Sequence, residues 1–259
     1  MITINNNMYV LDTDNTSYAF AVLGSGQLEH LYYGRKLHAN EAVMTEKHTF
    51  IPGNTNVYNK DYSSYSLEDV CLEMSSLGKG DIREPFIEVT YPNGSSTTDM
   101  VFDRAEIIQG KEEYDTLPGS YDDNGEVEQL VIYLKDRNYN LTLELHYYVY
   151  EKCDIITRSA KLVNSGNESV RLERLMSMQL DLNESDYELS FFNGAWAREM
   201  NRSRIPIRAG KYVNESVTGT SSNRANPFFM VGRSSTTEDY GECYGFNLIY
   251  SGNHYEAAQ

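Results

Sequence analysis

Four stretches in the middle of the chain have the residue pattern of consecutive β-strands. They cover residues 131–134, 140–150, 155–163 and 170–182. Runs of turn-forming residues separate them, and this regular spacing predicts a meander of antiparallel strands. In the second stretch every other residue is apolar, so one face should belong to a core and the other should face water. The apolar residues are Leu141, Leu143, Leu145, Tyr147 and Val149.

Turn-forming residues predict further hairpins elsewhere in the chain. Asp12-Thr13-Asp14-Asn15 and Asn93-Gly94 each lie between two short apolar runs, and Asn-Gly in that setting is a strong hairpin signal. Two more short apolar runs, 227–231 and 244–250, are joined by a polar segment. With 21 tyrosines among 259 residues, the sequence predicts an all-β chain that is long enough for one large domain or two smaller ones.

Charge and cysteine usage limit the partners and the compartment. The formal net charge of −16 repels phosphate backbones and anionic lipid, which leaves neutral or cationic ligands. The N-terminus has no basic region followed by an apolar core, and no run approaches the roughly 18 apolar residues of a membrane span, so we expect a cytoplasmic protein. The three widely spaced cysteines, Cys71, Cys153 and Cys243, are expected to be buried thiols.

The usual catalytic and metal-binding motifs do not account for this sequence. Ser25 lacks the Gly-X-Ser-X-Gly elbow and its following helix, and the glycines on either side of it predict a tight turn. The acidic residues of 111–128 lack the alternating spacing of a calcium loop and predict a solvated connection. The histidines have no His-Glu-X-X-His or His-X-His spacing, so we expect no metal and no cofactor. They are His30, His38, His48, His146 and His254.

Several short phrases spread along the chain resemble one enzyme family. They include Gly78-Lys79-Gly80-Asp81-Ile82-Arg83-Glu84-Pro85, Gly194-Ala195-Trp196-Ala197-Arg198-Glu199 and Asn226-Pro227-Phe228-Phe229. In this order, and together with further matches from Gly26 to Asn253, they resemble the N-terminal domain of the family 36 glycoside hydrolases, the bacterial-type α-galactosidases.

This resemblance implies a fold, an activity and an assembly. The fold would be a large two-sheet antiparallel β-sandwich of the galactose-mutarotase-like type, formed as a single domain by residues 1–259. The parent would be a retaining α-galactosidase that removes terminal α-linked galactose from oligosaccharides such as raffinose and melibiose, and that needs no cofactor. Its catalytic carboxylates would lie in a (β/α)₈ barrel C-terminal to this segment, so these 259 residues alone are expected to be inactive. The parent would be a homotetramer.

The resemblance also implies that an N-domain loop reaches toward a neighbour's sugar pocket, and the aromatic-rich segment 44–65 is the candidate. Phe50 would offer a stacking surface and Asp61 a hydroxyl acceptor. Lys47 and Ser63 depart from the polar residues that family members carry nearby, so an ordinary surface loop is the alternative. The only tryptophan, Trp196, could stack on sugar, but we expect it to pack in a core or between sheets.

Three other functions are compatible with the sequence. The chain could be a stand-alone carbohydrate-binding module, for which its many tyrosines and Trp196 are the supporting features. It could be a purely structural oligomerisation domain. Mutarotase activity is the third, and it rests on analogy of fold alone.

Overall fold

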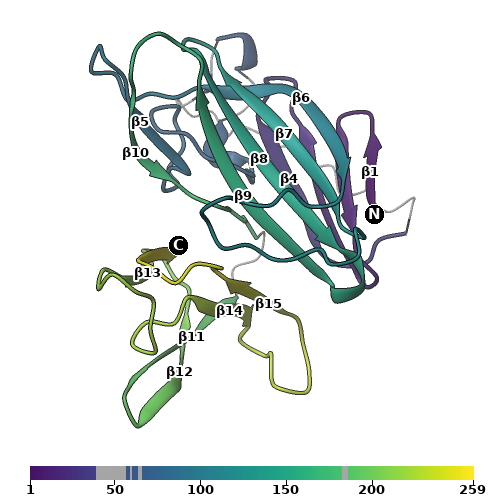
Figure 1. Cartoon of the computed structure of the whole chain (residues 1–259), viewed down its shortest axis with the longest axis vertical. Coiled ribbons are helices and arrows are strands. Elements are labelled where there is room, and N and C mark those ends of the chain that lie inside the picture. The colour runs from purple at the N-terminus through teal and green to yellow at the C-terminus, as the bar shows by residue number, and fades with distance from the viewer. Residues whose placement is uncertain (39–56, 59, 64–65, 183–185) are drawn as a thin grey trace. The chain divides into compact units, whose positions relative to one another are not determined.

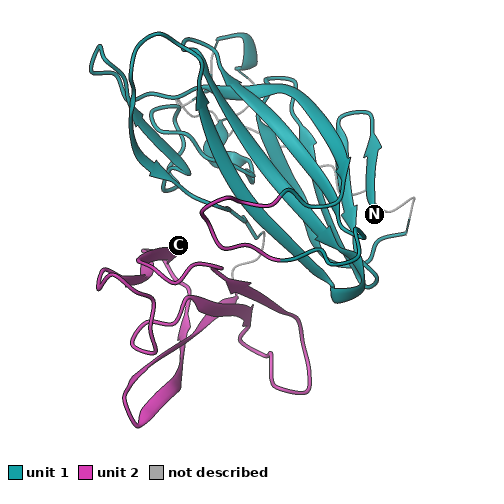
Figure 2. Ribbon diagram, viewed as in Figure 1, with its two compact units in different colours: residues 1–112, 121–182 teal, residues 113–120, 183–259 magenta. Residues whose placement is uncertain are grey.

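The computed structural model describes residues 1–38, 57–58, 60–63, 66–182 and 186–259. The chain divides into two compact units, shown in Figure 2. Unit 1 comprises Met1–Glu112 and Tyr121–Leu182, and unit 2 comprises Glu113–Ser120 and Asn183–Gln259. That residues 1–259 act as one domain stays a prediction.

The first sheet of unit 1 is an antiparallel meander in the order β1-β2-β3-β4 (Figure 1). Its strands are β1 (Ile2–Asn5), β2 (Met8–Asp12), β3 (Thr16–Val22) and β4 (Leu28–Arg35). The predicted hairpin at residues 12–15 is confirmed. The side chain of Asp154, a residue distant in the sequence, binds this turn. The Asp154 carboxylate accepts hydrogen bonds from the Asn15 backbone N–H and the Thr13 hydroxyl, both at 2.8 Å.

The second sheet of unit 1 is also an antiparallel meander, in the order β6-β7-β8-β9. Its strands are β6 (Met100–Gln109), β7 (Glu128–Asp136), β8 (Leu141–Tyr150) and β9 (Ile155–Asn164). The predicted meander is therefore confirmed over 131–163. Beyond it, only Arg171–Leu175 of the expected strand 170–182 is extended, as β10, which pairs with β5 (Ile87–Thr90). The described part of the unit also contains three short 3₁₀ helices: η2 (Lys60–Tyr62), η3 (Leu67–Asp69) and η4 (Glu151–Cys153).

The core of unit 1 is formed by side chains from both four-stranded sheets, which makes the unit a β-sandwich. Phe20 of β3 stacks on Tyr147 of β8 with ring centroids 5.2 Å apart. The alternating residues Leu141 to Val149 are all buried, as predicted. Burial of this many apolar side chains, at about 25 cal/mol per Å² of apolar surface, is the main force that holds the sheets together. The predicted all-β sandwich is confirmed.

The opposite face of β8 is not wet along its whole length, contrary to expectation. His146 and Tyr148 are 6% and 1% exposed. Gln129 places its side-chain Nε2 2.9 Å from Nδ1 of His146, and the Lys111 ammonium lies 5.1 Å from the centre of the Tyr148 ring. Long-range partners thus cover positions that the alternating pattern assigned to solvent.

Unit 2 contains a four-stranded sheet and a two-stranded sheet. The larger, in the order β12-β11-β14-β15, consists of β11 (Tyr187–Ala195), β12 (Arg198–Pro206), β14 (Phe228–Arg233) and β15 (Cys243–Asn247). The smaller pairs β13 (Tyr212–Ser216) with β16 (His254–Ala258). Within the described residues, the buried hydrophobic side chains of this unit are Leu189, Phe191 and Val231. Its core is therefore much smaller than that of unit 1.

The cysteines are not the buried thiols that we expected. Cys153 and Cys243 are exposed and Cys71 is only half-buried. Cys153 lies in η4 at the turn between β8 and β9, a surface position that the alternating strand pattern does not reveal. None of the helices in the described part of the chain is long and apolar enough to cross a membrane.

Candidate functional site

The two residues predicted from the resemblance are not brought together by the described structure. Phe50 and Lys47 lie outside the described residues, as does most of the segment 44–65. Asp61 is exposed in η2, and the neighbouring Tyr62 hydroxyl donates to the backbone oxygen of Gly24 at 2.5 Å. The roles of Phe50 and Asp61 in sugar binding therefore stay predictions.

Trp196 occupies the tip of the hairpin formed by β11 and β12, and its side chain is 92% exposed. The expectation that it packs in a core or between sheets is wrong. The reason is the turn itself, which places residues 196 and 197 beyond the last paired residues, Ala195 and Arg198. An indole with both faces open can contact a flat apolar surface such as one face of a sugar ring.

The family phrase around Trp196 has a physical explanation in this turn. A Cβ atom at position 194 would overlap with the backbone oxygen of Arg198, so only glycine fits there. Ala197 adopts φ 61°, and its N–H donates to the Glu199 carboxylate at 2.8 Å. Asn201 donates to the oxygen of Arg198 at 2.6 Å. Gly194, the side chain of Glu199 and the backbone oxygen of Arg198 thus shape the loop that presents Trp196.

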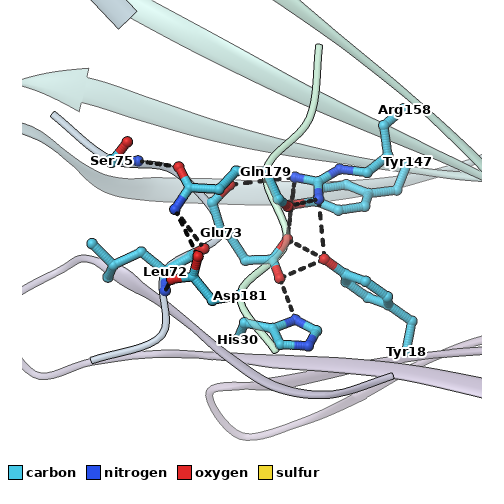
Figure 3. Close-up of polar contacts among 9 residues, drawn as sticks. All are labelled: Tyr18, His30, Leu72, Glu73, Ser75, Tyr147, Arg158, Gln179 and Asp181. Carbon is cyan, nitrogen blue, oxygen red and sulfur yellow. Dashed lines mark hydrogen bonds and ion pairs between the residues drawn. The ribbon is translucent and has the colours of Figure 1, made fainter. Parts of the chain in front are cut away.

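A buried polar cluster lies between the sheets of unit 1 and centres on Glu73, which is 0% exposed (Figure 3). Its carboxylate accepts hydrogen bonds from the Tyr18 hydroxyl at 2.6 Å and the Tyr147 hydroxyl at 2.8 Å. It also lies 2.8 Å from Nδ1 of His30 and 3.2 Å from a guanidinium nitrogen of Arg158. These partners come from β3, β8, β4 and β9, so one carboxylate joins both sheets.

The charges in this cluster are fixed by one another. Burial alone would raise the pKa of Glu73, but the Arg158 guanidinium together with His30 and Tyr18 outweighs it and lowers that pKa. Burial raises the pKa of the Tyr18 and Tyr147 hydroxyls well above their usual value. Glu73 is therefore ionised and both phenols are neutral at physiological pH. The cluster is a balanced set of donors around one anion.

This geometry gives the cluster a structural role rather than a catalytic one. Glu73 and His30 are 0% and 2% exposed, so no sugar reaches the only close carboxylate and imidazole pair of the cluster. Both carboxylate oxygens already accept hydrogen bonds from protein side chains. A mutarotase would need a comparable acid and base open to a sugar, and the geometry of this pair does not favour that alternative.

A second set of contacts beside Glu73 fixes the segment that carries it (Figure 3). Asp181 accepts the Leu72 N–H at 2.8 Å and pairs with Nε of Arg83 at 2.7 Å. Gln179 accepts the Ser75 N–H at 3.0 Å. Arg83 also pairs with Asp81 at 2.8 Å, which explains why both residues occur in one family phrase. Burial raises the pKa of Asp181, and Arg83 opposes that shift.

Among the described residues of unit 2, Glu256 is a half-buried carboxyl group with an altered pKa. Burial raises the pKa of Glu256 to about 7, and the Asn214 side chain, which donates to it at 2.7 Å, opposes the shift. A cavity of about 10 Å³ beside these two residues is lined by Tyr212 and Phe229, and it has room for about one water molecule. Within the described ranges, no three His, Cys, Asp or Glu side chains are grouped as metal ligands.

Comparison with known proteins identifies the family. The model of the glycosyl hydrolase family 36 N-terminal domain matches residues 26–259. The bifunctional α-galactosidase/sucrose kinase AgaSK of Mediterraneibacter gnavus is 34% identical over 250 residues, which are 96% of this chain and 27% of that protein.

Solved structures give the same answer. The crystal structure of the α-galactosidase from Lactobacillus brevis matches with a TM-score of 0.92 and 35% identity, over 98% of this chain and 35% of that one. An AgaA variant from Geobacillus stearothermophilus in complex with raffinose matches with a TM-score of 0.89 and 32% identity, over 96% of this chain and 35% of that one. The chain thus spans between about a quarter and about a third of the length of these proteins.

Proposed function

The chain belongs to glycosyl hydrolase family 36, as its N-terminal domain, and from this premise we propose that it is the non-catalytic domain of a retaining α-galactosidase. The substrates would be oligosaccharides with terminal α-linked galactose, of the raffinose and melibiose type. The observation that carries the proposal is the match over almost the whole chain to proteins named α-galactosidases, one of them solved with raffinose.

Catalysis is proposed to lie outside these 259 residues. Retaining glycoside hydrolysis usually needs two carboxyl groups about 5–5.5 Å apart, on either side of the glycosidic bond. The buried carboxylate Glu73 is already bound on both oxygens by protein groups. A (β/α)₈ barrel in the remaining length of the parent enzyme would supply the catalytic pair.

The domain's own contribution would be to support the barrel, to assemble the oligomer and to complete a sugar pocket. Trp196 suits the last role because its exposed indole can pack on the apolar face of a galactose ring. Phe50 and Asp61 are proposed as further contacts of a neighbouring subunit's pocket. The homotetramer and the cytoplasmic location belong to the same proposal, and sedimentation of the parent enzyme and cell fractionation test them.

Hydrolysis of a chromogenic α-galactoside tests the division of labour. We expect no activity in the purified 259-residue chain and activity in the longer protein that contains it. Activity in the 259-residue chain would mean that a carboxylate pair is hidden within this domain. The same assay with a β-galactoside controls for the anomeric specificity.

The exposed indole also favours a second candidate, a carbohydrate-binding module. Because Trp196 is the only tryptophan, its emission reports directly on a sugar at the hairpin tip. A saturable change on titrating the 259-residue chain with raffinose would support the module, and no change at millimolar sugar would contradict it. Light scattering of the same sample tests a purely structural oligomerisation role, which a strict monomer at high concentration would contradict.

A further inference from the structure

One side chain and its backbone connect both strands of the Trp196 hairpin just below the tip. The Asn226 N–H donates to the backbone oxygen of Phe192 at 3.1 Å. Its side-chain Nδ2 donates to the sulfur of Met200 at 3.4 Å. Phe192 comes four residues before Trp196, and Met200 comes four residues after it. Asn226 therefore contacts β11 and β12 at two positions that are each four residues away from Trp196 in the sequence.

Asn226 is in turn fixed by the small sheet of unit 2. The backbone oxygen of Asn226 accepts a hydrogen bond from Nδ2 of Asn214 at 2.8 Å, and the same Nδ2 donates to the Glu256 carboxylate at 2.7 Å. An amide NH₂ has two hydrogens, so it can make both bonds at once. Asn214 is only 8% exposed and lies directly opposite Glu256 in the β13–β16 pair. Asn214, which is itself held in the small sheet, therefore fixes the backbone of the half-buried Asn226.

The hairpin tip has hydrogen bonds of its own, from Ala197 to Glu199 and from Asn201 to Arg198, but it buries no side chain that would anchor it. Residues 196–200 are all exposed, and Ala197 and Met200 adopt φ values of 61° and 55°, which residues other than glycine rarely take. Strained backbone of this kind persists only where surrounding contacts determine it. Phe192 does stack on Phe228 of β14, with ring centroids 5.8 Å apart, but this contact involves β11 and no residue of β12.

We propose that Asn214 and Asn226 are positioning residues that fix the direction in which the hairpin presents the Trp196 indole. The contact of Trp196 with a sugar rests on the proposed function, whereas the order of the hairpin does not. Asn214 acts through the backbone of Asn226, and Asn226 acts on both strands. Neither residue touches the indole itself in the described structure.

Hydrogen exchange of the hairpin amides and the fluorescence anisotropy of Trp196 test this proposal in the 259-residue chain. Asn214→Asp keeps the shape of the side chain but replaces the donor with an acceptor that faces the Asn226 oxygen and Glu256. We expect about tenfold faster exchange over residues 193–201 and a lower anisotropy, with exchange in β14 and β15 unchanged. Asn226→Ala removes only the contact with Met200, so its effect should be about threefold.

The matched control is a variant in unit 1. Asn7→Ala removes a side-chain hydrogen bond to the oxygen of Val22 in unit 1, and it should leave the hairpin unchanged. Unchanged hairpin exchange in Asn226→Ala overturns the proposal, as does an equal rise across all of unit 2. If Asn214→Asp fails to fold, Asn226→Ala at its half-buried position still decides.

A sugar titration of the longer protein separates this inference from the proposed function. The hairpin could be loosened in Asn214→Asp while Trp196 of the wild-type protein shows no contact with raffinose. That result would support the positioning role of Asn214 and contradict the sugar contact. If both hold, Asn214→Asp should raise KM for an α-galactoside while kcat changes less. A KM equal to that of the wild type, despite a loosened hairpin, would contradict the link between hairpin order and sugar binding.

Discussion

Glu73 joins the two sheets of unit 1 because its carboxylate contacts side chains on four strands, through hydrogen bonds and the ion pair with Arg158. Replacing it with alanine would leave the guanidinium of Arg158 buried without its anion and two buried phenols without their acceptor. We expect Glu73→Ala to lower the free energy of unfolding by about 3–5 kcal/mol. Urea denaturation followed by circular dichroism measures this.

The control is Glu126→Ala, which removes an exposed ion pair with Lys152 and should leave the urea midpoint almost unchanged. A loss below about 1 kcal/mol in Glu73→Ala would show that the cluster contributes little to stability.

Glu256 predicts a stability that depends on pH. Its folded-state pKa of about 7 lies above the ordinary value of 4.5, so the folded state binds a proton that the unfolded state releases between these values. Its stabilising contribution is therefore present below about pH 4.5 and is lost as the pH rises through about 7. Because the group is half-buried, we expect a loss of roughly 1–2 kcal/mol.

The urea midpoint of unit 2 is measured at pH 5 and at pH 8. Hydrogen exchange of the β13 and β16 amides is the probe. Glu256→Gln is the control because it keeps the shape and cannot titrate. A decline with pH that is equally steep in Glu256→Gln would assign the effect to other carboxyl groups.

The sequence could not single out Glu73. It is one of 38 acidic residues and lies between Leu72 and Met74, a setting that suits many surface strands. Its hydrogen-bond partners Tyr18 and Tyr147 lie 55 and 74 residues away. Only the folded topology brings them together, and local patterns carry no signal for contacts of that separation. Asn214 escaped prediction for the same reason.

The Trp196 hairpin is the element whose local strain is easiest to test. Ala197 adopts φ 61°, a conformation that costs an alanine about 1 kcal/mol more than a glycine. Ala197→Gly should therefore stabilise the hairpin or leave its stability unchanged, whereas Ala195→Gly, in the strand, should destabilise it by about 0.5–1 kcal/mol. Hydrogen exchange over residues 193–201 compares the two variants. Equal effects of the two glycines would contradict the assigned backbone strain.

Most elements defined by local patterns were predictable, and elements defined by distant contacts were not. The hairpin predicted at Asn93-Gly94 is an exception, because β5 and β6 on either side of it pair with β10 and β7 instead of with each other. The strands from 131 to 163 and the hairpin at 12–15 follow from alternation and turn chemistry within a few residues. The exposure of Trp196 depends on the turn after Ala195. Gly194, just before this turn, allows a close approach to the Arg198 backbone that the residue pattern does not predict. Likewise, residues 176–182 alternate apolar and polar side chains as a strand would, but they form no strand, and Gln179 and Asp181 bind the Glu73 segment instead.

The two units of the molecule differ in how much apolar surface they bury. The main core of unit 1 contains 20 buried hydrophobic side chains, whereas the described part of unit 2 buries Leu189, Phe191 and Val231. Since apolar burial is the dominant favourable term in folding, unit 1 should have a higher free energy of unfolding than unit 2. In the parent enzyme, the proposed barrel would give unit 2 additional partners.

Native-state hydrogen exchange of the 259-residue chain tests this contrast. The amides of β7 and β8 should have an opening free energy at least about 2 kcal/mol higher than those of β11 and β14. They should therefore exchange roughly 30-fold more slowly. In the longer protein, the gap should narrow because further contacts protect unit 2. Equal opening free energies in the isolated chain would contradict the expected difference and would instead support the prediction that residues 1–259 unfold as one domain.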